Sequence, residues 1–506
     1  MESTDLRDRL RRALVQPVDS AGLAIFRIGF GSIIAWEVWR AHDSGLIRAD
    51  YDLPGYLFRW WLFEWVRPLP GPLIYVAFAV LGLAGAMLAL GFLYRTAAIV
   101  TCVGLTYWIL LDKSSYLNHR YLAATLAFLL IFVPANAAYS VDAWRKPSVR
   151  SWTVPAWSVW LLRFQVGAPY FFAGVAKLNF DWLFRAEPLK SALALHTDFP
   201  IIGRFFESNG LAHVLAWGSA ALDCTVPFLL LHRRTRVPAF GLALAFHFLN
   251  ARLFEIGIFP WMMIVGTTLF FEPDWPVRMR NSLRSGGRLV RAAILSGFAL
   301  GFAIGGFLPT EFAPVRALVG GFGVAVLAFH VVPTRLRAPA RSIEASSRSA
   351  RRFQLHRPLA VLIAVWIVVQ VLVPLRHYAI PGNVHWTEEG NRWAWHLLLR
   401  AKTAQLRFLV EDPTTGERWV ESLDSHLTAY QISKVRLPDM ILQFAHHLKA
   451  YYADEQRDVE VRVEAYAKLN GRPAQWFIYP HQDLTQIRRP YIPPADWIEP
   501  LKPYEG

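Results

Sequence analysis

Long blocks of apolar residues, separated by short polar stretches, fill the first 378 residues of the chain. One membrane crossing needs about 20 mostly apolar residues. The pattern therefore predicts a multi-span α-helical membrane protein with about nine to eleven transmembrane helices. The predicted spans lie near 22–40, 71–93, 95–111, 119–135, 156–176, 211–231, 237–253, 256–272, 289–308, 315–333 and 358–376. The shortest of them can be tilted or re-entrant.

The pattern changes after residue 378, where apolar and polar residues alternate as in half-buried strands. Residues 379–506 are therefore predicted to form an extramembrane α+β, β-rich domain. Its expected elements are strands at 405–410 and 458–467, a helix at 437–452, and hairpin turns at 414–416 and 470–471.

An Arg/Ser/Ala-rich stretch interrupts the apolar blocks before the last predicted span. It is expected to be a basic cytoplasmic linker. The sequence thus predicts four parts: a transmembrane helical domain at 1–333, the linker at 334–357, the last transmembrane helix at 358–378, and the extramembrane domain at 379–506.

Composition and charge agree with a membrane protein. Hydrophobic residues make up 54% of the chain and charged residues only 18%, too few to cover a soluble body of this kind. Residues 379–506 hold 15 Lys and Arg against 17 Asp and Glu, so the net charge of +15 comes entirely from the first 378 residues. These cations lie in short loops, a pattern typical of membrane topology, so the lipid bilayer and not nucleic acid is the expected partner.

The positions of the basic loops predict the orientation in the membrane. With eleven crossings and a cytoplasmic N-terminus, all the basic clusters fall on the cytoplasmic side. The C-terminal domain then lies on the outer (periplasmic or lumenal) face. The clusters are at 7–12, 145–150, 233–236, 278–291 and 335–357.

Three polar segments stand at the outer ends of predicted spans: Asp112–Tyr121, Tyr170–Trp182 and Phe246–Gly257. Ionisable groups are costly in a membrane, so they are candidates for function. The predicted orientation places all three at the face that carries the C-terminal domain, and we expect one site there. Within the third segment, Arg252 and Glu255 have the spacing of a structural i,i+3 ion pair.

The residues alone leave structural alternatives open. His119 can be a polar residue of an outer loop, and Lys177 can extend to the lipid headgroups as helix-terminal lysines do. His247 and Asn250, three residues apart, can be a buried hydrogen-bonding pair. Metal-binding spacings are absent from the sequence, so no metal is expected.

Several of these segments resemble the hallmark sequences of vitamin K-dependent γ-glutamyl carboxylases, in a bacterial-type form. The resemblance runs from Pro17–Gly31 to the WIEPL string near the end and is weakest over 275–357. Its most specific parts are LDKSS with the following Asn-His, the Tyr170–Trp182 segment, FHFLNARLFEIGIF from Phe246, and the segment from Trp386 to Trp395.

The resemblance implies the chemistry. Lys177 matches the family lysine that deprotonates reduced vitamin K, and burial beside an apolar quinone pocket would favour the neutral amine that a base requires. The quinol then reacts with O2 and forms an epoxide-linked alkoxide, which removes a γ-proton from glutamate. The resulting carbanion captures CO2. The implied cofactor is vitamin K hydroquinone, with O2 and CO2 as co-substrates.

The family histidine in the Asn-His turn matches His119, which the resemblance makes a second catalytic residue supporting the proton transfers. Asn118, His247, Asn250 and Tyr170 are the expected cofactor-binding residues around it. The prenyl tail would lie between apolar helices.

The family binds the substrate glutamate after its Trp-Thr pair, which maps to 391–402 here. Asn391, Trp395, Arg400 and Lys402 are therefore the expected substrate-binding residues, and the two cations suit a carboxylate. The chain departs from the family at Asn391, where the family has tyrosine, and at Arg400, where it has histidine.

Three functions remain open from the sequence. The first is γ-carboxylation of glutamate in a peptide or protein, coupled to epoxidation of vitamin K hydroquinone, in a multi-pass membrane protein (of the inner membrane if bacterial). The second is a quinol-oxidising membrane enzyme with a different acceptor. The third is a transporter or scaffold, which explains the intramembrane charges but not the convergence of the three polar segments.

Overall fold

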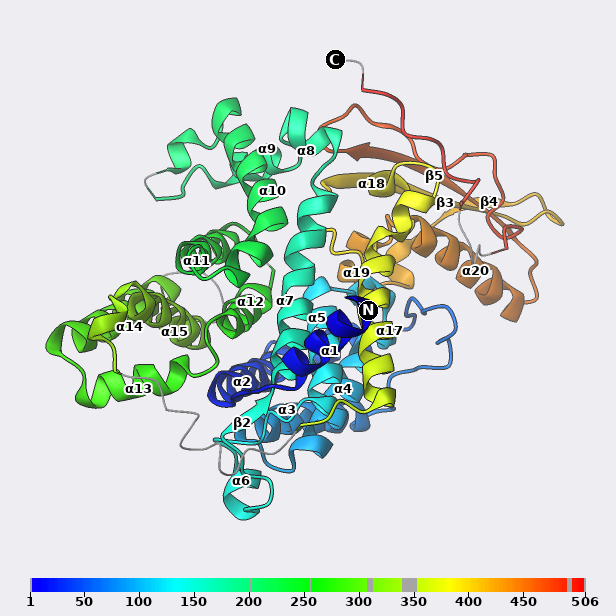
Figure 1. Cartoon of the computed structure of the whole chain (residues 1–506). Coiled ribbons are helices and arrows are strands. Elements are labelled where there is room, and N and C mark those ends of the chain that lie inside the picture. The colour runs from blue at the N-terminus through cyan, green and yellow to red at the C-terminus, as the bar shows by residue number, and fades with distance from the viewer. Residues whose placement is uncertain are drawn as a thin grey trace.

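The computed structural model describes residues 2–200, 202–254, 256–306, 313–338, 353–488 and 494–504. Each of the eleven predicted spans is helical in it (Figure 1). These helices are α2 (Ala21–Asp43), α3 (Leu73–Leu90), α4 (Tyr94–Leu111), α5 (Asn118–Phe132), α7 (Ala156–Ala176), α10 (Asn209–Leu231), α11 (Arg236–Leu253), α12 (Phe259–Thr267), α14 (Arg288–Gly306), α15 (Ala313–Val331) and α17 (Arg357–Leu375). Among the described residues, seven helices are long and apolar enough to cross a membrane. The prediction of a multi-span membrane protein is confirmed.

The seven apolar helices do not include α5, α7, α11 or α12. α5 begins at Asn118 and His119, α7 ends beside Lys177, and α11 contains His247. Polar groups lower the mean hydropathy of a span, and α12, with only nine residues, is too short to cross alone. The helices that carry the expected site are thus the least typical spans.

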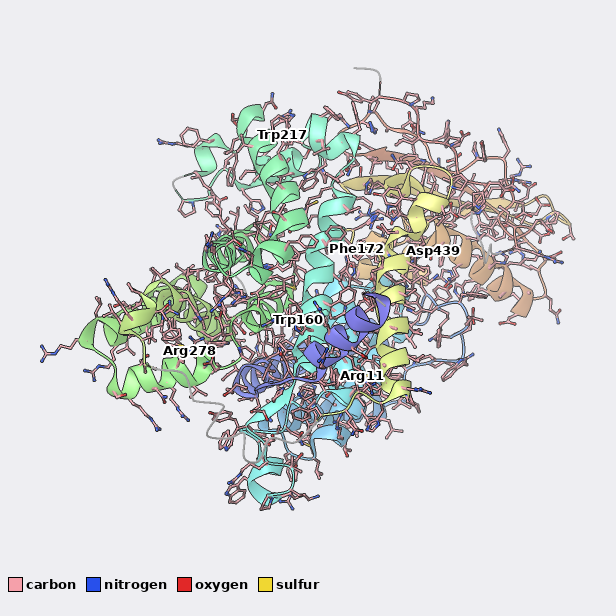
Figure 2. The ribbon with its side chains drawn as sticks, viewed as in Figure 1. Arg11, Trp160, Phe172, Trp217, Arg278 and Asp439 are labelled. Carbon is pink, nitrogen blue, oxygen red and sulfur yellow. The ribbon has the colours of Figure 1, made fainter. Side chains whose placement is uncertain are left out.

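Helix α7 lies at the centre of the helical body, packed against α10, α5, α12 and α17. Figure 2 shows Trp160 near its lower end and Phe172 above it, so the helix runs toward the side where the C-terminal strands lie in Figure 1. A short antiparallel pair of strands, β1 (Pro17–Asp19) and β2 (Thr153–Pro155), joins the starts of α2 and α7. This pairing fixes the end of α7 opposite to Lys177.

Close helix pairs in the body rely on glycine. A side-chain carbon on Gly301 of α14 would lie 2.3 Å from the backbone oxygen of Gly320 in α15, and one on Gly31 of α2 would lie 2.5 Å from a backbone nitrogen of α3. Small residues let helix backbones approach in a membrane, where the hydrophobic effect cannot drive packing.

Several short helices were not predicted from the sequence because they lie in loops or at the chain start, outside the apolar blocks. They are α1 (Glu2–Val15), α6 (Val141–Arg145), α8 (Phe180–Arg185), α9 (Leu189–Leu193), α13 (Trp275–Ser285) and α18 (Val384–Thr387). Most of the predicted linker, including 339–352, lies outside the described residues.

The C-terminal domain is an antiparallel four-stranded sheet in the order β4-β3-β5-β6, covered by helix α20. Its elements are β3 (Lys402–Glu411), β4 (Arg418–Glu421), α19 (Ala429–Lys434), α20 (Pro438–Asp454), β5 (Glu460–Leu469) and β6 (Gln475–Trp476). The predicted strands, helix and both hairpin turns are confirmed. Gly416 and Gly471 have φ near +72°, a conformation that glycine adopts without strain.

The sheet domain is fastened to the helical body. Phe58, from the loop between α2 and α3, is fully buried in the core of the C-terminal domain with Phe408 and Phe444. Asp181 of α8 accepts hydrogen bonds from Asn470 (3.1 Å) and Arg472 (2.6 Å) in the turn after β5. Loops far apart in sequence therefore hold this domain over the ends of α5 and α7.

Candidate active site

Lys177 caps the C-terminal end of α7 and is only 5% exposed. Its ammonium forms a buried ion pair with Asp223 of α10, which is 2% exposed. The Lys177 nitrogen also lies 5.3 Å from the ring centre of Trp182 and 6.0 Å from that of Phe246. The lysine therefore does not extend to the headgroups: it is held inside an aromatic-lined cluster.

Asp223 was missed in the sequence analysis. It is a lone carboxylate within the predicted span 211–231, and the rule that ionisable residues in a membrane mark function would have selected it. Its partner could not be read from the sequence, because the two residues lie 46 positions apart on different helices.

Gly174 allows α7 and α10 to approach closely enough for this ion pair. A side-chain carbon at Gly174 would lie 2.5 Å from the backbone nitrogen of Cys224. We expect Gly174→Ala to destabilise the protein by about 1–3 kcal/mol and to lower activity by separating Lys177 from Asp223. Thermal unfolding in detergent, with turnover measured on the same sample, checks this.

The matched control is Gly167→Ala on the same helix. There the new carbon would lie 3.4 Å from the Pro227 side chain, an ordinary contact, so little change is expected. Equal losses in both variants would contradict the role of Gly174.

His247 of α11 is buried and bonded to Tyr170 of α7, with 2.5 Å between Nε2 and the phenol oxygen. Its Nδ1 is buried and has no hydrogen-bond partner among the described residues. The sequence analysis paired His247 with Asn250, but the Asn250 side chain makes no hydrogen bond within the described chain. The structure pairs His247 with Tyr170, another of the expected cofactor-binding residues.

His119 lies in the first turn of α5, buried against the turn between α11 and α12. A side-chain carbon on Gly257 would lie 2.9 Å from the imidazole, so only glycine leaves room for the ring. The ring of His247 is centred 6.2 Å from that of Phe259, two residues after Gly257. His119 and His247 thus both contact the short segment 257–259, as the convergence of the polar segments predicted.

Asn118 is engaged with the C-terminal domain. Its Oδ1 accepts from Tyr116 (3.1 Å), and its Nδ2 donates to the backbone carbonyl of His396 (3.3 Å). Its role as a cofactor-binding residue stays a prediction. The expected pair of Arg252 with Glu255 involves a residue outside the described ones; Arg252 lies 3.6 Å from Asp198.

The expected substrate segment, 391–402, crosses over the ends of α5 and α7. The carbonyl of His396 binds Asn118 at one side, and Leu399 packs in one cluster with Ala176 at the other. This segment covers the Lys177 region from the outer face.

Asn391 and Trp395 each present a buried polar atom without a partner among the described residues, namely Oδ1 of Asn391 and Nε1 of Trp395. The indole of Trp395 is centred 5.0 Å from the ring of Tyr121. Buried polar groups are normally hydrogen-bonded, so these two atoms support a polar ligand at this segment.

Arg400 and Lys402, expected to bind a carboxylate, are both paired with one from the chain itself. Glu388 forms ion pairs with both, at 2.7 Å for Lys402. Burial opposes ionisation of Glu388, but the two cations hold its pKa below the usual range. Burial lowers the pKa of Lys402 to about 8, although Glu388 opposes that shift. The sequence analysis missed Glu388.

A second carboxylate, whose side chain is 38% exposed, joins the two domains. Asp439 of α20 accepts from Lys113 (2.8 Å) of the LDKSS segment and from Arg392 (2.8 Å). Figure 2 shows Asp439 where the C-terminal domain meets the helical body. Burial alone would raise the pKa of Asp439, but Arg392 and Lys113 hold it well below its usual range.

Three histidines gather beside the substrate segment. The ring centre of His396 lies 4.6 Å from that of His377 and 5.4 Å from that of His385. Burial lowers the pKa of His385 to about 3 and that of His396 to about 2. Within the described ranges, no group of three or more His, Cys, Asp or Glu side chains is arranged to hold a metal ion.

The burial of these histidines predicts that the folded state loses stability in acid. His385 and His396 are neutral when folded but take up protons below pH 6.5 when unfolded, so the folded state loses stability as the pH falls from 6.5 toward their folded pKa values. Each should contribute about 2 kcal/mol of loss between pH 6.5 and 5. Thermal unfolding at pH 7, 6 and 5 tests this, and His396→Leu should flatten the dependence. Parallel curves for both proteins would contradict the prediction.

Comparison with known families agrees with the geometry. The HTTM domain family matches residues 15–275, more than half of the chain and all of the helices that hold Lys177, Asp223, His119 and His247. The family described as vitamin K-dependent gamma-carboxylase, lumenal domain, matches residues 355–503, which include the expected substrate segment 391–402. No solved structure matches the chain. Together the two family matches show that the chain belongs to the vitamin K-dependent γ-carboxylase family.

Proposed function

We propose that this protein carboxylates glutamate residues of a peptide or protein, and that O2-dependent epoxidation of vitamin K hydroquinone drives the reaction. The observation that carries the proposal is the buried pair of Lys177 and Asp223 at the outer end of α7, beneath the segment 391–402. The family matches support the carboxylase activity. The coupling to O2 and the identity of the acceptor are parts of the proposal that the family matches do not address.

The residues around Lys177 fit a reduced naphthoquinone. Such a molecule has an apolar ring system and two hydroxyl groups that need hydrogen-bond partners. Trp182 and Phe246 supply aromatic contacts near the lysine, and His247 presents a buried Nδ1 without a partner among the described residues. Lys177, His247 and His119 would hold the quinol oxygens, with Tyr170 setting the orientation of His247.

Asp223 explains how Lys177 can act as a base. A base needs a lone pair, but an ion-paired lysine is protonated. Moving the proton from the ammonium of Lys177 to the carboxylate of Asp223 turns the charged pair into a neutral pair. Surroundings of low polarity reduce the free-energy difference between these two states. Lys177 Nζ can then accept a proton from a quinol hydroxyl while Asp223 holds the other proton.

Bound vitamin K hydroquinone would supply, through its reaction with O2, a base strong enough for the γ-carbon of glutamate, which no side chain can deprotonate. The chain's part is to exclude water and to position the acceptor. The segment 391–402 covers the Lys177 region from outside, and Asn391 and Trp395 carry buried polar atoms that have no partner among the described residues and can bind an acceptor. We further propose that the N-terminus is cytoplasmic, as the basic loops predict.

One assay tests the proposal. Purified protein in nanodiscs would receive vitamin K hydroquinone, O2, labelled bicarbonate and a glutamate-containing peptide, and both epoxide and fixed label would be measured. Both products are expected, and neither should form without O2. Absence of both products would overturn the proposal.

A second candidate, quinol oxidation with a different acceptor, is favoured by one observation. The cations expected to bind the substrate carboxylate are already paired with Glu388. Epoxide without fixed label would identify this second function.

A further inference from the structure

Arg400 and Lys402 form a partly buried site for one carboxylate, and Glu388 fills it. The Glu388 side chain is 8% exposed and that of Lys402 is 3% exposed. Lys402 also donates to the carbonyl of Trp386 (2.8 Å) and lies 4.2 Å from the ring centre of Phe477. Burying the charges of Glu388 and Lys402, beside an Arg400 side chain that is 24% exposed, costs desolvation energy that a simple apolar contact would avoid. Stability alone therefore does not explain this arrangement.

Glu388 is poorly placed for a permanent structural role. Its φ is +62°, in the left-handed region, which costs a residue with a side chain about 1 kcal/mol or more. It follows the one-turn helix α18 and precedes Gly390, which also has a positive φ of 74°. Strained backbone of this kind tends to lie at functional sites.

Glu388 also borders a cavity of about 330 Å³ between the two domains, within the size range of small-ligand sites. Aromatic and charged side chains line it, among them Trp60, Lys113, Arg392, Trp393 and Trp497. A carboxylate that enters this cavity meets Glu388 before it reaches the two cations.

We propose that Glu388 is a resident competitor at the carboxylate site formed by Arg400 and Lys402, and that the acceptor carboxylate must displace it. The identity of the acceptor in this inference rests on the proposed function. The exchange of one carboxylate for another at this site is independent of the proposed function. A site held by an internal group binds an external ligand more weakly, in proportion to the fraction of time that the site is free. Glu388 therefore sets how tightly the enzyme binds its acceptor.

Anion rescue tests the exchange without any turnover. Glu388→Ala leaves the buried Lys402 and the partly exposed Arg400 without their partner and should lower the unfolding temperature of the full chain in nanodiscs. Sodium acetate, compared with sodium chloride at equal ionic strength, should restore about 2–4 °C in this variant and have little effect on wild type. N-acetyl-glutamate amide should act like acetate, and N-acetyl-glutamine amide should not.

The matched control is Glu389→Gln. Glu389 borders the same cavity but accepts from the backbone nitrogen of Ala495 (3.0 Å). This variant should show no acetate response. If acetate stabilises wild type and Glu389→Gln as much as Glu388→Ala, or stabilises none of them, Glu388 is only a structural counter-ion and the proposal fails.

If the alanine variant does not fold in chloride, the same unfolding measurement is made with Glu388→Gln, which keeps the shape of the side chain. Recovery of either variant only when acetate is present supports the exchange, and failure of both in acetate overturns it. In the carboxylation assay, Glu388→Gln should lower the KM for the peptide about tenfold with a much smaller change in kcat. If no variant carboxylates but acetate still rescues Glu388→Ala, the anion site stands and the proposed function falls.

Discussion

A variant carrying Lys177→Met together with Asp223→Leu should fold and enter the membrane but oxidise quinol roughly 10²–10⁴-fold more slowly than wild type, the range of a lost general base. Lys177→Met alone would leave Asp223 charged and unpaired in an apolar site, at a cost of about 3–5 kcal/mol. Replacing both charges with apolar side chains of similar size avoids that cost. Loss of activity in the double variant then reports chemistry rather than unfolding.

The measurement is epoxide formation per folded protein, with thermal unfolding as the check on folding. The control is the same pair of changes at an exposed ion pair, Lys449→Met with Asp458→Leu, which should keep full activity. Asp223→Asn should keep Lys177 but remove the carboxylate that accepts the lysine proton. The rate of epoxide formation by this variant should therefore rise more steeply with pH than the rate of wild type. Wild-type turnover in the Lys177/Asp223 double variant would place the base elsewhere.

The second large effect is expected at the contact between the domains. Asp181 is a buried carboxylate that binds Arg472 (2.6 Å), Arg185 (3.1 Å) and Asn470 (3.1 Å). Asp181→Leu leaves the buried Arg472 unpaired, so the docked state should lose about 3–5 kcal/mol. Limited proteolysis should then release the C-terminal domain, and carboxylation should fall because the segment 391–402 no longer lies over Lys177.

Two further variants separate docking from other effects. Asp181→Leu combined with Arg472→Met should recover part of the protease resistance, because only Arg185 then remains without its carboxylate. Glu464→Leu, at the exposed pair with Arg407, should change protease resistance little. Undiminished resistance of Asp181→Leu would show that other contacts carry the docking.

The helices of the membrane body could be predicted because each crossing needs a long apolar block, a property of local sequence. The strands and turns of the C-terminal domain could be predicted for a similar reason, since alternation and the Asn470–Gly471 pair are local signals. The convergence of the Lys177, His119 and His247 segments followed from counting crossings, which assigns each loop to a face. These features do not depend on which helix packs against which.

Ion-pair partners could not be predicted in this way. Lys177 with Asp223 and Lys113 with Asp439 join distant parts of the chain, and helix neighbours are set by packing that sequence pattern does not reveal. Glu388 is close in sequence to Arg400, but the pairing depends on positive φ values at Glu388, Trp393 and Trp395, which bulky residues rarely adopt. The sequence therefore suggested that Arg400 and Lys402 are free to bind a substrate, whereas in the structure both are paired with Glu388.

The placement of Phe58 bears on the biogenesis of the protein. This residue is synthesised early, between the first two membrane helices, yet its side chain completes a core built from the last part of the chain. Domains generally fold in the order of synthesis. The loop around Phe58 must therefore wait on the outer face, its apolar side uncovered, until translation ends. A chain that stops before residue 379 would keep that surface exposed, a feature by which quality-control proteases could recognise incomplete copies.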